Sequence, residues 1–309
     1  MKVSIIGGTG FVGHYLVEGL QEAQHTPRLL VRAGSENKII AAARCETVTG
    51  DVNDQAAIEA CLQGTDLVIY LIGILREFPS KGITFENSQF LGVQRTIAAA
   101  KKWGVKRFIL MSANGVKGGG TPYQDTKYRA EEAVKASGLA WTIFRPSVIF
   151  GDPKGKTEFC TQLKKDLVEP AIPAPLFFAG IKLLQAGEFQ MQPVHITDVA
   201  SAFVAAVDDA RSIGQTYHLC GAEAQSWNSI IQTIAHATGK KRKLAVPAPA
   251  AVVQIAAGLL DQYAWFPITR DQISMLLEGN TSQDTAAWQT FNIQPKGFEL
   301  AHLRYLSRL

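Results

Sequence analysis

The sequence lacks closely spaced cysteines and long apolar runs. Its four cysteines, Cys45, Cys61, Cys160 and Cys220, are far apart and form no Cys-x-x-Cys pair, so they are interpreted as reduced core thiols and not as metal ligands. No window reaches the ~18 uninterrupted apolar residues of a membrane-spanning helix. The first expected strand starts at residue 2, which leaves no room for a signal peptide. The sequence therefore predicts a cytoplasmic protein without a metal.

Clustered charge is also scarce. The formal net charge is +4 over 309 residues, and the basic cluster that stands out is KKRK at 240–243. A cluster this short is typical of a solvated loop, so nucleic acid is not an expected partner. A chain of this length can bury a sizeable core, and we expect one large domain with a smaller appendage.

Three glycines near the start are spaced as in a phosphate-binding turn. They follow the apolar stretch KVSII and precede an amphipathic helical stretch. Gly7 would allow a tight turn, Gly10 a close approach of backbone to a pyrophosphate, and Gly13 close packing of helix on strand. The diphosphate would then lie at the helix N-terminus. The cofactor-binding residues expected in this turn are Gly7, Thr9, Gly10, Phe11, Val12 and Gly13.

Strand-like and helical stretches alternate through the first half of the chain, which is typical of a parallel sheet. The expected strands are 2–6, 27–32, 45–51, 66–73, 106–112 and 140–149, with one more at 216–221. The expected helices include 36–43, 54–63, 87–104 and a helix starting at Tyr123. This pattern predicts an α/β fold, a Rossmann-type doubly wound parallel sheet with the ligand at the carboxyl ends of the strands.

The alternation of strand-like and helical stretches ends at about residue 150, and the sequence that follows is irregular and rich in proline. We expect a dinucleotide-binding domain over 1–150, to which 192–220 returns. Residues 151–191 and 221–309 are expected to form a smaller, mostly helical substrate or lid portion.

The end of the second expected strand indicates which dinucleotide is bound. An acidic residue there would bind the ribose 2′-hydroxyl, whereas an arginine would accept a 2′-phosphate. Here the stretch RLLVRAG places Arg32 at that position, with Lys38 nearby, so NADP(H) is favoured over NAD(H). Asp51 is placed to contact the adenine, although an ordinary helix cap is the alternative, for which Asp54 fits better. Further cofactor contacts are expected from Val52, Leu71, Gly73, Lys127 and Pro146.

Tyr123 and Lys127 form a Tyr-x-x-x-Lys pair on one face of an expected helix. A cation beside a phenol lowers the phenol pKa, so Tyr123 could protonate a carbonyl oxygen as hydride arrives. Lys127 could also bind the nicotinamide ribose. The pair therefore predicts the catalytic acid of a reductase.

Several motifs occur in the order of a known family: GGTGFVG, GDVND, KRFILMS, the Tyr-x-x-x-Lys pair, RPSVIFGDPKG and QPVHITDVA. In this the chain resembles the extended and atypical short-chain dehydrogenase/reductases, including the NAD-dependent epimerase/dehydratase group. The stretches EPAIPAPLFFAG, QMQPVHITDVA and FPITRDQISMLLEGN are most similar to the branch containing the nucleotide-binding accessory subunit of respiratory complex I and its stand-alone bacterial relatives. The resemblance implies a tightly held nicotinamide nucleotide, and several members of that branch are thought to be structural or assembly factors.

One position departs from the pattern of the catalytic members. They place Ser or Thr near the end of the fifth strand, where this sequence has Ala113. Ser112, one position earlier, is the candidate for this catalytic role. Alternation would point it to the other face, unless the strand ends at Met111 and the loop redirects the hydroxyl. Asn114 is an alternative donor.

Other polar residues are interpreted as structural. The resemblance implies that Arg145 is an architectural ion-pair residue, that His195 is a hydrogen-bonded residue where two domains join, and that Asp198 is a helix N-cap. His218 lies in an apolar strand and is also expected to be structural.

Two apolar stretches that contain prolines, 171–184 and 244–260, allow two interpretations. We favour a buried lid over the substrate cleft, and the alternative is a surface that lies against a membrane or a partner.

Two functions therefore remain. The first, which we slightly favour, is an NADPH-dependent reductase of a carbonyl or activated alkene in a hydrophobic substrate. The second is a non-catalytic nucleotide-binding structural, assembly or redox-sensing protein, associated with a respiratory membrane complex and peripheral to the inner face of the membrane.

Overall fold

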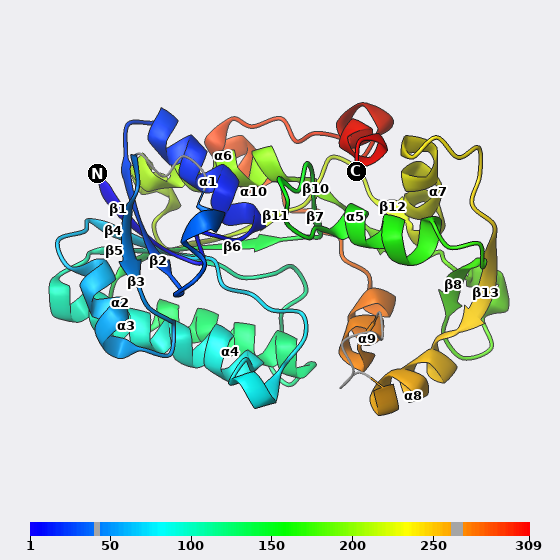
Figure 1. The fold of residues 1–309 in the computed structure, drawn as a ribbon, viewed down its shortest axis with the longest axis horizontal. Helices are drawn as coiled ribbons and strands as arrows, with labels where there is room; N and C mark the ends of the chain where they lie inside the picture. Colours follow the sequence, from blue (N-terminus) through cyan, green and yellow to red (C-terminus); the bar gives the residue numbers. More distant parts are fainter. Residues whose placement is uncertain (40–43, 261–267) are drawn as a thin grey trace. The chain divides into compact units, whose positions relative to one another are not determined.

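A seven-stranded parallel sheet, with strand order β11-β6-β5-β4-β1-β2-β3, forms the centre of the first part of the chain (Figure 1). This order is that of a Rossmann sheet extended by one strand beyond β6, and the predicted fold class is confirmed. The strands are β1 Lys2–Ile6, β2 Thr26–Val31, β3 Glu46–Thr49, β4 Leu67–Tyr70, β5 Arg107–Met111, β6 Ala140–Pro146 and β11 Gln215–Leu219.

The computed structural model describes residues 1–39, 44–260 and 268–309, which divide into two units. The first unit comprises Met1–Pro146, Ile196–Leu219 and Asp284–Ile293. The second comprises Ser147–His195, Cys220–Gln283 and Gln294–Leu309. None of the helices in the described ranges is long and apolar enough to cross a membrane.

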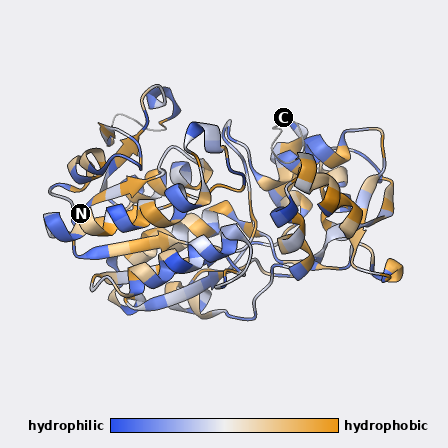
Figure 2. Ribbon diagram, turned by 90° about the horizontal axis from the view of Figure 1, so that it is seen from below, coloured by the Kyte–Doolittle hydropathy of each residue, from blue (hydrophilic) through white to orange (hydrophobic). Residues whose placement is uncertain are grey.

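Helices cover both faces of the large sheet (Figure 1). On one face lie α1 Phe11–Glu22, α6 Ile196–Asp208 and α10 Ala286–Phe291, and on the other lie α2 Gln55–Leu62, α3 Gly92–Trp103 and α4 Pro122–Lys135. Because both faces are covered, the central strands are mostly apolar: all four residues of β4 are buried, and so are Val3, Ile5 and Ile6 of β1. Figure 2 shows this as hydrophobic colouring along the central strands.

The second unit is built on short strand pairs and helices. Its strand pairs are β7 Ile149–Phe150 with β10 Val194–His195, β9 Gln190–Met191 with β12 Gln225–Ser226, and β8 Ala174–Phe178 with β13 Ala245–Pro249. Its helices are α5 Phe159–Leu163, α7 Trp227–Ala237, α8 Ala250–Leu260, α9 Arg270–Glu278, the 3-10 helix Leu300–Ser307 and the π-helix Lys164–Val168. Trp227 and Ile230 of α7 lie in its apolar core.

Some element boundaries differ from those expected. The strand expected over 140–149 ends at Pro146, and Ile149–Phe150 form a separate strand that pairs with β10. The helix expected over 87–104 starts as a π-helix, Glu86–Leu91, before α3. Of the helix expected over 36–43, the structure shows a 3-10 turn, Glu36–Lys38, and residues 40–43 lie outside the described residues.

Candidate functional site

The glycine turn after β1 has the backbone geometry that a phosphate-binding turn requires. Gly7 has a φ of +97°, a conformation that side chains rarely adopt. The Gly10 N–H donates to the Gly7 oxygen at 3.2 Å, and Gly10 then caps α1 without a side chain. A Cβ on Gly13 would lie 2.4 Å from the Gly8 oxygen, so the first turn of α1 packs directly on the backbone.

The N-terminus of α1 is suited to an anion. Its first turn contains no acidic side chain, and a Cβ on Gly10 would meet only the Gly7 oxygen, at 3.4 Å. The positive end of the helix dipole is therefore accessible at Gly10, where the atoms of an anionic ligand can approach the backbone closely. Thr9 and Phe11 beside it are half-buried, and Val12 is buried.

Arg32 follows β2 directly and is exposed. Its carbonyl accepts the Ser35 N–H at 2.9 Å, which starts the turn that leads to Lys38. His14 of α1 lies with Nε2 2.7 Å from the Lys38 carbonyl oxygen, and this contact ties the turn to the helix that carries the glycines. The first acidic residue after Arg32 is Glu36, also exposed.

Asp51 lies just beyond β3, with its carboxylate engaged locally. Oδ1 accepts the backbone N–H of Asn53 at 2.9 Å and its side-chain amide at 2.8 Å. Asp54, as expected, caps α2 by accepting two backbone N–H groups. Val52 is buried beneath this turn, so the loop presents Asp51 from a fixed backbone.

Lys127 reaches the carboxyl ends of β4 and β5. Its side chain is buried, its Nζ donates to the Met111 oxygen at 3.1 Å, and a Cβ on Gly73 would lie 3.4 Å from the same Nζ. Burial lowers the pKa of Lys127 to about 8, while Glu131 acts in the opposite direction. Lys127 therefore lies between two loops at the edge where the sequence expects the cofactor.

Tyr123 lies one helical turn before Lys127, as the spacing predicts. The Lys127 Nζ is 5.8 Å from the centroid of the Tyr123 ring, and the ring packs edge-on against Phe85 at 5.8 Å. Burial raises the pKa of Tyr123, which is the reverse of the direction expected from the neighbouring lysine. The phenol is therefore fully protonated at neutral pH.

Ser112 lies directly after β5, in a loop that borders the gap around Lys127. β5 ends at Met111, the Ser112 N–H donates to the Phe144 oxygen at 2.7 Å, and the side chain lines the same narrow gap as Lys127 and Gln89. The Ser112 Oγ is buried, with no hydrogen-bond partner among the described residues. Ser112 and Lys127 thus line the same gap, with Ser112 in the loop that follows β5. Tyr123 does not line this gap.

Asn114 and His218 form a second polar contact beyond β5. The Asn114 Oδ1 and the His218 Nδ1 are 2.7 Å apart, and the Asn114 backbone N–H donates to the oxygen of the buried Pro146. Burial lowers the pKa of His218, which favours its neutral form. This contact ties the loop after β5 to β6 and β11, which supports a structural role for His218.

Arg145 is the architectural ion-pair residue that the resemblance implies. Its Nε and Nη2 donate to the two carboxylate oxygens of Glu131 at 2.9 and 2.6 Å. Glu131 is fully buried on the same helix as Lys127, four residues further along. The pair therefore joins α4 to β6 and balances a buried carboxylate next to the lysine.

Two further expectations have clear outcomes. Asp198 is the third residue of α6, which begins at Ile196, so the expectation that it caps this helix is wrong. Two residues precede it because the chain leaves β10 and turns directly into the helix. His195 packs in the second unit against Phe150, at 5.1 Å between rings, and burial lowers its pKa to about 4. A neutral, packed imidazole is consistent with the structural interpretation.

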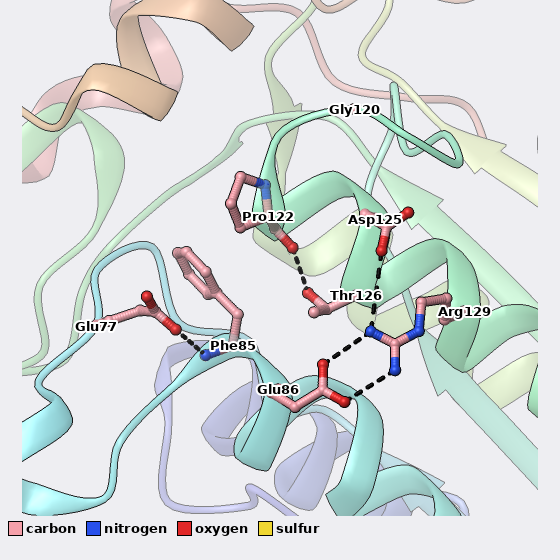
Figure 3. A pocket seen from close by; sticks show the side chains of 8 residues that line it. All are labelled: Glu77, Phe85, Glu86, Gly120, Pro122, Asp125, Thr126 and Arg129. Carbon is pink, nitrogen blue, oxygen red and sulfur yellow. Dashed lines mark hydrogen bonds and ion pairs between the residues drawn. The ribbon is translucent and has the colours of Figure 1, made fainter.

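A cavity of about 390 Å³ lies at the start of α4, where Pro122 and Thr126 line it (Figure 3). The Nη1 and Nη2 groups of Arg129 donate hydrogen bonds to the two carboxylate oxygens of Glu86, each at 2.8 Å. The Phe85 N–H donates to Glu77 at 2.7 Å. These contacts hold the loop after β4 against α4, with Phe85 on the Tyr123 ring. No local pattern in the sequence predicts this cavity, because Glu86 and Arg129 are 43 positions apart.

Comparison with known proteins identifies the family. A family model described as NAD(P)H-binding matches residues 7–173. The chain belongs to this family. With the motifs in their order, the match confirms the resemblance to the epimerase/dehydratase-like short-chain dehydrogenase/reductases, and the matched domain is of an NAD(P)H-binding type.

Individual relatives differ in what they are named for. The 40 kDa subunit of mitochondrial NADH-ubiquinone oxidoreductase from Neurospora crassa is 25% identical over 276 residues, covering 86% of this chain and 67% of the relative. A ceramide reductase from Caulobacter vibrioides is 28% identical over 278 residues, covering 86% and 79%. An epimerase structure from Methanothermobacter thermautotrophicus is 18% identical with a TM-score of 0.75, covering 99% and 91%, and shows the shared fold.

Proposed function

We propose that this protein is an NADPH-dependent reductase that acts on a carbonyl or activated alkene in a hydrophobic substrate. The observation that carries the proposal is the set of polar side chains around Lys127. They are a buried lysine with a depressed pKa, a protonated Tyr123 one turn away, and Ser112, which lines the same gap as the lysine and whose hydroxyl has no partner among the described residues. A buried, uncompensated polar group is costly to a fold, so its presence at a ligand edge favours a functional role.

The residues at the edge of the sheet fit a nicotinamide nucleotide. Gly7, Gly10 and Gly13 leave the backbone bare at the N-terminus of α1, where the diphosphate would accept N–H groups. The exposed Arg32 and Lys38 would bind a 2′-phosphate, and Asp51 with Val52 would border the adenine. Leu71, Gly73 and Pro146 would border the nicotinamide end, where Lys127 would bind the ribose hydroxyls.

The proton would come from Tyr123. When the reduced nicotinamide is bound, it would supply a hydride to the carbonyl carbon. The phenol of Tyr123 would donate its proton to the carbonyl oxygen, which would give an alcohol. The raised pKa of Tyr123 keeps the proton in place until an alkoxide, a stronger base than phenolate, develops. The ammonium of Lys127 stabilises the resulting phenolate, which regains a proton from solvent.

Ser112 would orient the substrate. Its Oγ can donate a hydrogen bond to a carbonyl oxygen and so perform the task that the catalytic members assign to Ser or Thr at the position of Ala113. Ser112 follows β5 directly, since the strand ends at Met111.

The test is to identify the nucleotide that copurifies with the full chain and to follow its absorbance on addition of carbonyl and quinone panels. NADPH oxidation that is lost in Tyr123→Phe and retained in Tyr128→Phe, on the same helix, would support the reductase. Nucleotide that stays bound and is not oxidised by any substrate would contradict it.

A second function is favoured by a specific observation. Tyr123 does not line the gap that holds Ser112 and Lys127, and the Neurospora crassa relative is named as a subunit of a respiratory complex. We infer from this an alternative in which the nucleotide is a fixed structural or sensing ligand of a protein that associates with such a complex. Retention of the nucleotide without turnover, together with copurification of respiratory subunits, would select this alternative.

A further inference from the structure

The two apolar stretches of the second unit carry exposed side chains, contrary to the buried lid that the sequence favoured. Ile181 and Leu184 are each 99% exposed, and Ile172 is 71% exposed. In the other stretch, Leu244 and Ile255 are exposed by 64% and 68%. Large aliphatic side chains seldom gather on a surface without a partner. These segments therefore need an explanation outside the core of this unit.

Strand pairing brings the two stretches side by side. β8 and β13 are parallel, with Ala174 opposite Ala245 and Phe178 opposite Pro249. The loop 179–186 and helix α8 therefore both leave the same end of the pair (Figure 1). Exposed apolar residues run along the whole pair, from Ile172 and Leu244 at its start to the loop and α8 beyond its end.

Helix α8 has its apolar stripe on the exposed face. Val252, Ile255 and Leu259 recur at i, i+3 and i+7, and each is more than 60% exposed. The opposite face carries small residues, Ala250 and Ala257, which are buried. Figure 2, viewed from below, shows hydrophobic colouring on the helices of this unit. With only 11 residues, α8 is too short to span a bilayer but long enough to lie in its interface.

The charges within the two stretches are all of one sign. Residues 171–184 and 240–260 contain five cations and no carboxylate, although the whole chain has a net charge of only +4. Lys182 stands exposed between Ile181 and Leu183, and Lys241 and Arg242 are exposed just before β13. Lys240 and Lys243 instead donate to carbonyl oxygens at 168 and 170. The apolar surface is thus flanked at both ends by cations, which is the pattern that binds anionic lipid.

We infer that the loop 179–186, the exposed face of α8 and the flanking cations form a docking surface for an anionic phospholipid bilayer. Ile181, Leu184 and the α8 stripe enter the acyl boundary, and Lys182, Lys241 and Arg242 meet the phosphate groups. The inference does not depend on the proposed reductase activity, because a hydride acceptor plays no part in it.

The experiment is cosedimentation of the full chain with vesicles of phosphatidylcholine alone or mixed with phosphatidylglycerol. We expect binding to the mixed vesicles and weak binding to phosphatidylcholine. Ile181→Ser and Leu184→Ser should each weaken binding about tenfold, because each removes a large aliphatic side chain from the interface. Lys182→Glu and Arg242→Glu should each weaken it about fivefold or more, and high salt should act similarly.

Matched controls lie elsewhere on the surface. Ile213→Ser replaces an aliphatic residue that is 43% exposed in the first unit, and Lys101→Glu reverses an exposed charge on α3; neither should alter binding. Unchanged thermal unfolding of every variant shows that the fold is intact. Absence of sedimentation with mixed vesicles at low salt would overturn the inference. So would self-association in solution that Ile181→Ser and Leu184→Ser abolish, since a second copy would then be the occupant.

Discussion

The two halves of the sheet's carboxyl edge are built in different ways. Beyond β1, the site is a run of consecutive backbone, in which Gly7, Gly10 and Gly13 fix a turn within seven residues. Beyond β4 and β5, the site is assembled from distant side chains: Lys127 bonds a carbonyl 16 positions away, and Asn114 contacts His218 104 positions away. We call the turn beyond β1 the nucleotide end and the residues beyond β4 and β5 the chemical end. The conformation of the nucleotide end therefore depends on backbone geometry, and that of the chemical end on burial and long-range contacts.

The largest effect should come from crowding the nucleotide end. Gly13→Ala places a Cβ 2.4 Å from the Gly8 oxygen, which is backbone and cannot move aside cheaply. We expect a loss of more than about 3 kcal/mol in the free energy of unfolding and no detectable nucleotide binding. Thermal unfolding and nucleotide titration measure both.

Gly19→Ala is the matched control on the same helix. Its Cβ would meet only the Val204 side chain, at 3.0 Å, and alanine favours the helix by about 1 kcal/mol. Gly19→Ala should therefore leave stability and binding close to those of the parent. If both variants bound nucleotide normally, the nucleotide end would not depend on its backbone as we argue.

At the chemical end, Lys127→Met should separate function from stability. The folded pKa of about 8 lies below the ordinary lysine value, so at pH 7 the folded state holds a proton more weakly than the unfolded chain does. The charged lysine thus lowers the free energy of unfolding by up to about 3 kcal/mol at pH 7, and this cost fades as the pH rises towards ~10.5. The variant should unfold at a higher temperature at pH 7, gain less at pH 10, and lose reductase activity about a hundredfold or more.

Lys135→Met, also on α4, is the control for Lys127→Met. Lys135 is half-buried, pairs with Glu132 at 2.8 Å and lies 3.9 Å from Glu131, so its loss should change stability by about 1 kcal/mol or less. A Lys127→Met variant that was less stable at pH 7 than the parent would show that its contact with the Met111 oxygen outweighs the cost of burying its charge.

The contrast between the two ends also explains what the sequence could predict. The glycine turn, the strands and the Tyr-x-x-x-Lys spacing are local patterns, and the structure has them where they were expected. The direction of the Tyr123 pKa and the place of Ser112 depend on burial and on where β5 ends. The exposure of Ile181 and Leu184 goes against the favoured buried lid and fits the alternative of a surface, because apolar composition alone does not distinguish a buried segment from an exposed one.

A smaller effect tests cofactor choice at the nucleotide end. Arg32→Ala removes an exposed cation expected to meet a 2′-phosphate, so NADPH affinity should fall about tenfold while NADH affinity stays the same. Isothermal titration with both nucleotides measures the ratio, with Lys101→Ala as a control on α3. An equal change for the two nucleotides would remove the argument for NADP(H).

The smallest effect on stability is expected for Ser112→Ala, which can be compared with the same substitution at Ser4. Ser4 in β1 and Ser112 just beyond β5 are both buried. The Ser4 hydroxyl donates to the Cys61 oxygen at 2.7 Å, whereas the Ser112 hydroxyl has no partner among the described residues. Ser4→Ala should therefore cost about 1 kcal/mol, and Ser112→Ala should be neutral or slightly stabilising. If Ser112→Ala nevertheless slows NADPH oxidation about tenfold, its hydroxyl serves a ligand and not the fold. Destabilisation of Ser112→Ala equal to that of Ser4→Ala would instead give this hydroxyl a structural role.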